Sequence, residues 1–394
     1  MRRLTLLTVM SVALSGPGVA QLPDLPSFGA DWTAVGLPRL YWTPANGITA
    51  GLLYAQVMQL GYDEWDAPPP YRMQLSLDGD IAASGSKRLR LEARMPQWID
   101  GWRFIVALEG RRDARERYAG IGNKSVIDDV NVTSDNPHYY RSDNHRLYGR
   151  LAVQRRIIGG LRVLAGLHAE RWKIDTLSGA SQLANDVAGG VDPAIGRGVG
   201  DVSARVGLVF DTRNDEPAPT SGVFLEAIVG FADSSVVGDV SYTRTNVSAT
   251  AYIPLRHNLG VAVRLAGQTM SGTPPLGAFY RFESSERPFL ALGGTSSHRA
   301  LPNRRLLDAD KLFANLDIRY DLIVEPTLFR VTAVGFLDAG RVFPAGDFKL
   351  TTNGLKVGGG AGLFVKLFRS AVVGSTTGIG PDGVILLFHT WWPF

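Results

Sequence analysis

The sequence predicts an all-β protein, a transmembrane antiparallel β-barrel of 16 strands. Three observations predict this fold. The chain begins with an export signal, its later segments alternate between apolar and charged residues, and its last residues alternate in steps of two and include several aromatic residues. Alternation of this kind is typical of barrels that turn apolar side chains to lipid and polar side chains to the lumen.

Composition narrows the class of protein. The 394 residues include 45 glycines and 22 prolines, which favours many turns over long helices. The absence of cysteine excludes disulfide scaffolds, thiolate nucleophiles and cysteine-ligated metal sites. All-β barrels often use a chain of this length as one domain. The formal net charge of +4 is too small for a nucleic-acid surface, so no nucleic-acid partner is expected.

The first twenty residues are interpreted as a cleaved signal peptide, with a buried N-terminal helix as the alternative. Arg2 and Arg3 form a positive start, residues 4–14 are apolar, and residues 18–20 fit a small-residue cleavage site. No later apolar run approaches the roughly 18 residues of a spanning helix, which leaves a secreted, periplasmic or outer-membrane protein. The expected regions are the signal peptide at 1–20, a short periplasmic segment at 21–36 and the barrel at 37–394.

The alternation is clearest in residues 87–96. Leu89 and Leu91 share one face, while Arg88 and Arg90 share the other. A soluble β-sandwich also alternates, but its apolar face usually carries large core residues. Here the apolar face is mixed in size and the polar face is rich in arginine and acids, which favours a lipid-facing wall around a polar lumen.

The strand count depends on which end of the barrel each connection faces. Long connections at 112–144, 173–200, 271–309 and 341–354 should face outside, and both chain ends should be periplasmic, so an odd number of strands precedes each. Fifteen candidate strands are found, and ten of them precede 271–309. A further strand at 37–44 makes the number before this loop odd and brings the total to 16, with 14 as the alternative. The strands are expected near 37–44, 48–59, 71–83, 87–96, 102–111, 145–156, 160–172, 201–213, 222–232, 241–254, 258–270, 310–321, 328–340, 355–367, 370–378 and 383–394.

The end of the chain resembles the closing strand of bacterial outer-membrane barrels. Steps of two back from Phe394 pass through Trp392 and Phe388, which places these aromatic residues on one face of a strand. The resemblance implies that the three form an assembly signal. Thr390 and Pro393 depart from the pattern.

Five motifs occur in an order that resembles the BamA/TamA-type outer-membrane barrels, also called bacterial surface antigens. The resemblance covers roughly residues 36–394, and each motif alone is weak. The motifs are YAGIGN at 118–123, DTRND at 211–215 followed by PTSG at 219–222, HRAL at 298–301, NLDIR at 315–319 and FLDAG at 336–340.

The resemblance implies that the loop at 271–309 folds back into the lumen and that Arg299 contacts Asp338. An arginine suits this task because its planar fork can bind both oxygens of a carboxylate. The alternative is that Arg299 is one of several solvated loop arginines. Ala300 and Leu301 replace a glycine and an aromatic residue of the family, so a glycine-type backbone at Ala300 would strain or reshape the tip.

Two further lumen pairs are expected from spacing within strands. Asp211 and Arg213 share a face of one strand, and so do Asp317 and Arg319. The pair of Asp211 and Arg213 is interpreted as structural.

Enzyme function is not predicted. His168 and Glu170 share a face and could start a general-base pair or a metal site, but lumen lining is the simpler interpretation. No Gly-x-Ser-x-Gly elbow and no phosphate-binding loop occurs, and glycines 358–360 lie in a predicted strand. No catalytic residue, cofactor site or metal site is therefore expected.

Two functions remain open. In the first, the barrel assists membrane insertion or translocation of proteins or other envelope substrates through a weak seam between its first and last strands. In the second, it is a passive channel that favours anions, or a structural surface barrel. Family members usually carry periplasmic POTRA modules, for which residues 21–36 leave no room. The expected location is the bacterial outer membrane. The expected partners are outer-membrane lipids, the barrel assembly machinery for its own insertion, and a separate periplasmic POTRA-type or client protein.

Overall fold

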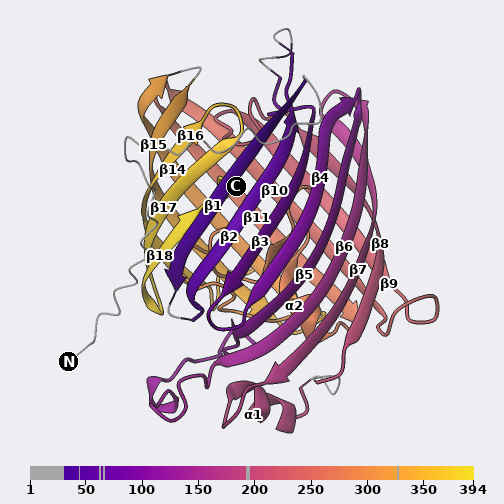
Figure 1. Ribbon diagram of the computed structural model, residues 1–394, viewed down its shortest axis with the longest axis vertical. Helices are drawn as coiled ribbons and strands as arrows, with labels where there is room; N and C mark the ends of the chain where they lie inside the picture. Colours follow the sequence, from indigo (N-terminus) through magenta and orange to yellow (C-terminus); the bar gives the residue numbers. More distant parts are fainter. Residues whose placement is uncertain (1–30, 44, 62–63, 65–66, 192–195, 326–327) are drawn as a thin grey trace.

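The computed structural model describes residues 31–394 apart from 44, 62–63, 65–66, 192–195 and 326–327. In these residues, sixteen strands form one antiparallel sheet that curves into a barrel wall (Figure 1). Each strand pairs with its neighbours in chain order, apart from a small hairpin between β11 and β14. The predicted fold and strand count are confirmed. The predicted signal peptide at 1–20 lies outside the described residues.

The strands range from 2 residues in β12 and β13 to 18 residues in β6, and the longer of the two α-helices, α1, has 7 residues. The elements are β1 (Trp32–Thr43), β2 (Gly47–Met58), β3 (Met73–Ala82), β4 (Lys87–Ile99), β5 (Trp102–Arg117), a 3₁₀ turn (Asp129–Asn131), β6 (Arg141–Ile158), β7 (Leu161–Thr176), α1 (Gln182–Ala188), β8 (Val199–Asp211), β9 (Gly222–Ala232), β10 (Tyr242–Arg256), β11 (Leu259–Gly272), α2 (Leu276–Phe279), β12 (Arg281–Phe282), β13 (Phe289–Leu290), β14 (Asp310–Glu325), β15 (Phe329–Phe343), β16 (Lys356–Leu367), β17 (Ala371–Gly380) and β18 (Gly383–His389). Among the described residues, no helix is both long and apolar enough to cross a membrane.

The outer face of the wall is apolar. Leu89, Leu91, Leu151 and Leu208 are all exposed there, whereas the other face of β6 and β8 carries buried polar residues such as Arg150 and Arg205. Exposed leucines on several strands are unfavourable in water and favourable against lipid. The wall therefore has the two faces that the alternation predicts.

The first strand begins earlier than predicted. β1 starts at Trp32, so residues 32–36, which were expected in the N-terminal segment, belong to the wall. The reason is the length of its partner, because β2 continues to Met58 and the register places Trp32 opposite Met58.

The barrel wall has a seam between β1 and β18. These two strands are the edges of the sixteen-stranded sheet, and no ladder joins them in the described part of the chain. β18 has 7 residues against 12 in β1, so part of β1 extends beyond its reach. Pro38 lies within β1, and proline is tolerated at an edge because it donates no ladder hydrogen bond. The sheet is thus not a closed hydrogen-bonded cylinder.

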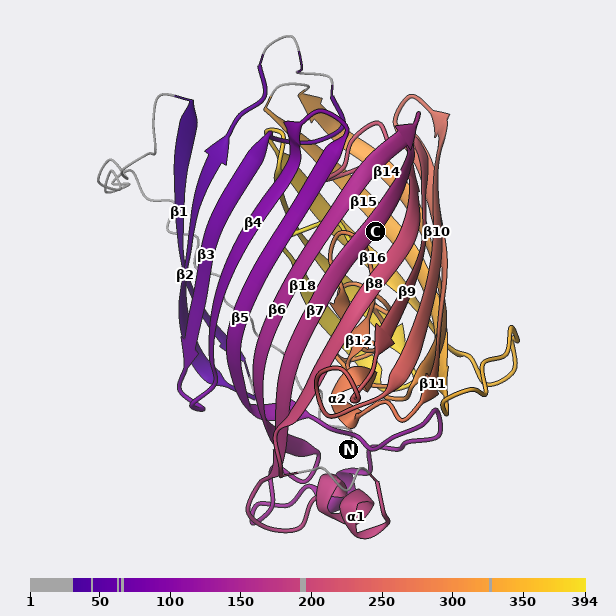
Figure 2. The same ribbon diagram turned by 90° about the vertical axis from the view of Figure 1, so that its right-hand side faces the viewer.

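The two ends of the barrel differ. Long connections, including the one with α1, gather at one end, here called the long-loop end (Figures 1 and 2). Short turns such as residues 159–160 between β6 and β7 lie at the other. This asymmetry is typical of outer-membrane barrels, whose long loops face the outside.

Candidate functional site

The lumen is occupied by the connection between β11 and β14, residues 273–309, here called the lumen loop. It contains α2, the β12–β13 hairpin and a tip around Arg299. Most of its side chains are buried, including the charged Arg281, Glu283 and Arg299. Figure 2 shows α2 and β12 inside the ring of strands. The prediction of a long loop folded into the lumen is confirmed.

A row of lumen-facing positions crosses four neighbouring strands where the tip lies. The register places Arg264 of β11 opposite Asn315 of β14, and Asn315 opposite Asp338 of β15. Asp338 in turn lies opposite Gly358 of β16. Side chains on one row of a sheet are direct neighbours. The wall therefore offers the tip a guanidinium, an amide, a carboxylate and an empty position side by side.

Arg299 joins the tip to this row. Its backbone amide and Nε donate to Asp338 Oδ2 at 2.7 and 2.9 Å, and its Nη2 donates to Asp338 Oδ1 at 2.7 Å. Its Nη1 forms an ion pair with Asp317 Oδ1 at 2.7 Å. All three side chains are at most 1% exposed. One planar guanidinium thus bridges carboxylates of two strands, which a lysine could not do with the same geometry. Arg299, Asp317 and Asp338 are called the tip contact below.

Glycines in β16 and β17 make room for the tip. A Cβ atom on Gly358 would lie 2.5 Å from the Cβ of Ala300, and one on Gly378 would lie 2.8 Å from the Ala300 Cα and from the Arg299 carbonyl oxygen. A Cβ on Gly380 would lie 2.2 Å from the Ala300 carbonyl oxygen. Ala300 itself is fully buried. These glycines form a flat part of the wall against which the loop backbone rests.

The backbone of Ala300 is not of the glycine type. Positive φ values occur instead at Gly293 (119°) and Gly294 (96°), and at Arg304 (57°). A Cβ on Gly294 would lie 1.9 Å from the Asn303 side chain, so glycine is required there. The turn that the tip needs is therefore made on either side of Ala300, and the substitution at that position introduces no backbone strain.

The structure also places the two predicted lumen pairs. Arg319 donates to Asp317 Oδ2 from Nε and Nη2 at 3.2 and 3.0 Å. Arg213 donates to Asp211 from Nε and Nη2 at 2.9 Å each. β8 ends at Asp211, so Arg213 lies in the following turn and not on the strand, where the sequence spacing had placed it. From there it also reaches Glu286 of the lumen loop, at 2.6 Å.

The C-terminal residues differ from the prediction. β18 ends at His389, and in residues 390–394, called the C-terminal tail, Thr390 and Trp391 are exposed whereas Trp392 and Pro393 are buried. Phe388 faces outward with 43% exposure, whereas Trp392 is buried, 4.6 Å from the ring of Phe364. The ring of Phe394 lies 4.7 Å below the guanidinium of Arg264. Placing these three aromatic residues on one face of a strand was therefore wrong, because aromatic and arginine side chains in the lumen bury the tail. Their role as an assembly signal stays a prediction.

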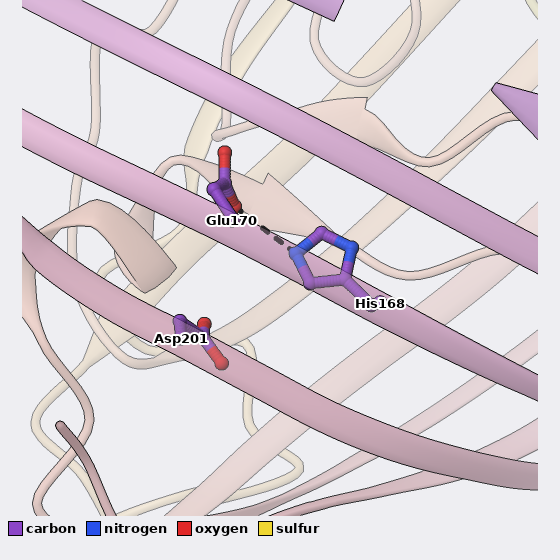
Figure 3. A group of neighbouring side chains, drawn as sticks. All are labelled: His168, Glu170 and Asp201. Atoms are coloured by element: carbon purple, nitrogen blue, oxygen red, sulfur yellow. Dashed lines mark hydrogen bonds and ion pairs between the residues drawn. The ribbon is translucent and has the colours of Figure 1, made fainter. Parts of the chain in front are cut away.

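His168, Glu170 and Asp201 form a compact buried group in the wall (Figure 3). One ligand atom from each lies within 4.8 Å of the others, a spacing that could suit a metal ion. The guanidinium of Arg281 already contacts this group. It forms ion pairs with Glu170 and Asp201 and approaches His168 Nε2. Arg281 of the lumen loop thus balances the negative charges of Glu170 and Asp201. This agrees with the interpretation that His168 and Glu170 line the lumen.

Sequence reasoning missed the contacts of Arg281 and Glu283. Glu283 pairs with Arg205 of β8 at 2.6 Å and with Arg244 of β10 at 3.2 Å. The available signal was the charged run at 281–287, RFESSER, inside a long loop. The run itself does not indicate which residues pair with it, because these partners lie on strands that are distant in the sequence.

The long-loop end of the lumen is covered as well. The YAGIGN segment at 118–123 crosses it, with Gly122 donating to the Leu307 carbonyl oxygen at 2.8 Å. Arg305 of the lumen loop forms an ion pair with Asp382 at 2.6 Å and donates to Ser125 Oγ at 2.9 Å. The first of the five motifs therefore packs on the lumen loop. The barrel thus has an occupied interior, and within the described part of the chain no ladder joins its first and last strands.

Comparisons with known proteins agree with this architecture. A family model described as the Omp85 superfamily domain matches residues 74–367. BamA from Haemophilus ducreyi lacking POTRA domains 1–3 superposes with a TM-score of 0.54 at 12% identity, covering 92% of this chain and 69% of that chain. CdiB from Escherichia coli gives 0.57 at 12% identity, covering 92% and 62%. This chain thus spans less than two thirds of the length of CdiB. At 12% identity, the likeness to BamA and CdiB shows a shared fold alone. No curated protein sequence matches the chain.

Proposed function

The chain belongs to the Omp85 superfamily, and on that premise we propose that it assists membrane insertion or translocation of proteins or other envelope substrates through the seam between β1 and β18. The observation that carries the proposal is the unpaired edge of the wall, since no ladder joins β1 to β18 across the described residues. An edge strand with free N–H and C=O groups is a template for pairing with another strand.

The occupied lumen supports a lateral route over an axial one. The lumen loop is buried among wall residues, and the tip contact holds it against β14 and β15. A substrate that followed the barrel axis would have to displace these buried ion pairs, whose disruption costs about 3–5 kcal/mol each. The seam needs no such displacement.

The chain is a bacterial outer-membrane β-barrel. We propose that residues 1–20 export it and that the barrel assembly machinery inserts it among outer-membrane lipids. The proposed partners are a separate periplasmic POTRA-type protein or a client protein.

The proposal is tested with vesicles that contain the purified barrel. Folding of an unfolded eight-stranded outer-membrane barrel into these vesicles, followed by its heat-modifiable gel shift, should be several-fold faster than into empty vesicles of the same lipid. Equal rates, with and without an added POTRA-type protein, would refute the proposal. A vesicle that contains an unrelated barrel of similar size is the matched control.

A passive channel is the second candidate, and one observation favours it. Lumen-facing arginines on the first strands, such as Arg39 and Arg88, keep 24% and 25% of their side chains exposed, so this part of the lumen is hydrated. They pair with Asp78 and Asp80, so their charge is largely balanced. In planar bilayers, a large, steady, anion-selective conductance would support the channel, whereas low conductance is expected from an occupied lumen.

A further inference from the structure

Two charged side chains at the start of the lumen loop enter separate sites on the barrel wall. They are Arg281 of β12 and Glu283, which follows β12, and they are 5% and 3% exposed. The two also pair with each other, with 2.5 Å between Arg281 Nε and Glu283 Oε1. Both sites belong to strands β7 to β10, whereas the tip contact belongs to β14 and β15.

The site for Arg281 is built by two acids on neighbouring strands. The register places Glu170 of β7 opposite Asp201 of β8, and both side chains are buried (Figure 3). The Tyr242 hydroxyl donates to Asp201 Oδ2 at 2.6 Å, and His168 Nε2 lies 3.1 Å from Glu170 Oε2. Arg281 forms ion pairs with both acids. Arg146 of β6 also pairs with Glu170, at 3.3 Å, so loss of Arg281 would remove the ion pair of Asp201 and leave its buried carboxylate facing Glu170 across adjacent strands.

The site for Glu283 is positively charged, whereas the site for Arg281 is negatively charged. Arg205 of β8 and Arg244 of β10 both lie opposite Gly230 of β9, which leaves a gap between two arginines. The Glu283 carboxylate fills this gap, at 2.6 Å from Arg205 and 3.2 Å from Arg244. All three side chains are at most 5% exposed. Without the glutamate, two buried arginines would repel each other.

Each loop charge therefore separates a pair of like charges in the wall. Withdrawal of the loop would expose both repulsions in a poorly hydrated site, where unpaired charges are strongly unfavourable. We propose that Arg281 and Glu283 form a second anchor, which holds the first half of the lumen loop in the barrel independently of the tip contact.

Neighbouring contacts extend the same anchor. Arg150 of β6 donates to the carbonyl oxygens of Ser284 and Ser285 at 2.8 and 2.7 Å. The Ser285 amide donates to Glu226 of β9 at 2.8 Å. The loop backbone after Glu283 is thus bound by wall side chains on both sides. If the barrel works as proposed above, release of the tip alone would leave half of the lumen occupied.

The lack of cysteine allows a direct test on the full-length chain. Ser285→Cys reports on the second anchor and Ser297→Cys on the tip, and both serines are at most 2% exposed. The rate of maleimide labelling is measured for each reporter in mild detergent. Arg281→Gln should accelerate labelling at position 285 at least about tenfold, because it leaves a buried charge unpaired, and should change labelling at position 297 less than about twofold. Arg299→Gln should do the reverse.

Controls keep the outcomes distinct. Arg287→Gln removes an exposed arginine of the same loop and should leave both rates unchanged. If Arg281→Gln lacks the heat-modifiable band of a folded barrel, Glu283→Gln, which removes the charge with little change in shape, replaces it with the same expectation. Unchanged labelling at position 285, or equal acceleration at both positions by either variant, would overturn the proposal. Because labelling involves no substrate, this result is independent of whether the barrel assists insertion.

Discussion

The close approach of the loop tip to the wall gives the most specific expectation. Gly378 of β17 faces Ala300, and a Cβ atom there would lie 2.8 Å from the Ala300 Cα and 3.1 Å from its Cβ. Carbon atoms in contact are normally about 3.5–4.0 Å apart. Gly378→Ala should therefore push the tip away from β17 and weaken the tip contact.

The size of the effect follows from the cost of overpacking. An extra methyl group in a packed site costs about 1–3 kcal/mol, which corresponds to about a 5- to 150-fold larger undocked fraction. Hydrogen–deuterium exchange reports this fraction at the buried amides of the tip, including Arg299, which donates to Asp338, and Leu301, which donates to His298. Exchange at these amides should accelerate by that factor.

A matched glycine serves as the control. A Cβ atom added at Gly335 of β15 would have no atom of the described residues within 4 Å, so Gly335→Ala should leave exchange in the tip unchanged. Wild-type protection of Arg299 and Leu301 in a folded Gly378→Ala variant would refute the idea that the tip rests on this glycine.

Further substitutions probe the other contacts. Arg299→Ala should weaken docking of the tip by about 3–5 kcal/mol, and Arg299→Lys by less, because lysine keeps the charge but not the fork; equal tip exchange in the two variants would contradict the bridging role. Trp392→Ala removes the ring packed on Phe364 and should destabilise the barrel by about 3–5 kcal/mol, seen as a lower temperature of the gel-shift transition; an unchanged transition would show that the tail is not packed. Asp382→Asn should cost only about 0.5–1 kcal/mol in the same assay, because its pair with Arg305 is partly exposed on the Asp382 side; a loss as large as that of Trp392→Ala would contradict this expectation.

The barrel could be predicted from the sequence because each strand carries its own signal. A residue such as Leu89 that faces lipid must alternate with one such as Arg88 that faces the lumen, and this pattern needs no knowledge of distant contacts. The lumen loop could be expected only through the resemblance of the motifs around Arg299 and Asp338. Asp317 was assigned to Arg319 alone, because nothing in the spacing indicates that a second arginine shares it.

Apart from the contact between Arg299 and Asp338, which the resemblance implied, the sequence did not predict the contacts between distant segments. Trp392 continues the two-residue alternation, yet lies inside the barrel because Phe364 and Arg319 bury it there. The sites for Arg281 and Glu283 depend on the register of β7 to β10, which only the assembled sheet defines. A weak seam was expected from the sequence, but its extent was not, because β18 ends at His389 and not at the predicted residue 394.

The seam can be tested directly by locking it. Cysteine pairs that join an outward position of β1, such as Leu40, to Val384 of β18 would be closed with a cleavable thiol crosslinker in vesicles. A pair at Ala50 and Ile81, which are opposite each other in the β2–β3 ladder, controls for crosslinking itself. We expect the seam lock to abolish assisted insertion, cleavage to restore it, and the control lock to have no effect. Full activity with the seam locked would contradict the proposed lateral route.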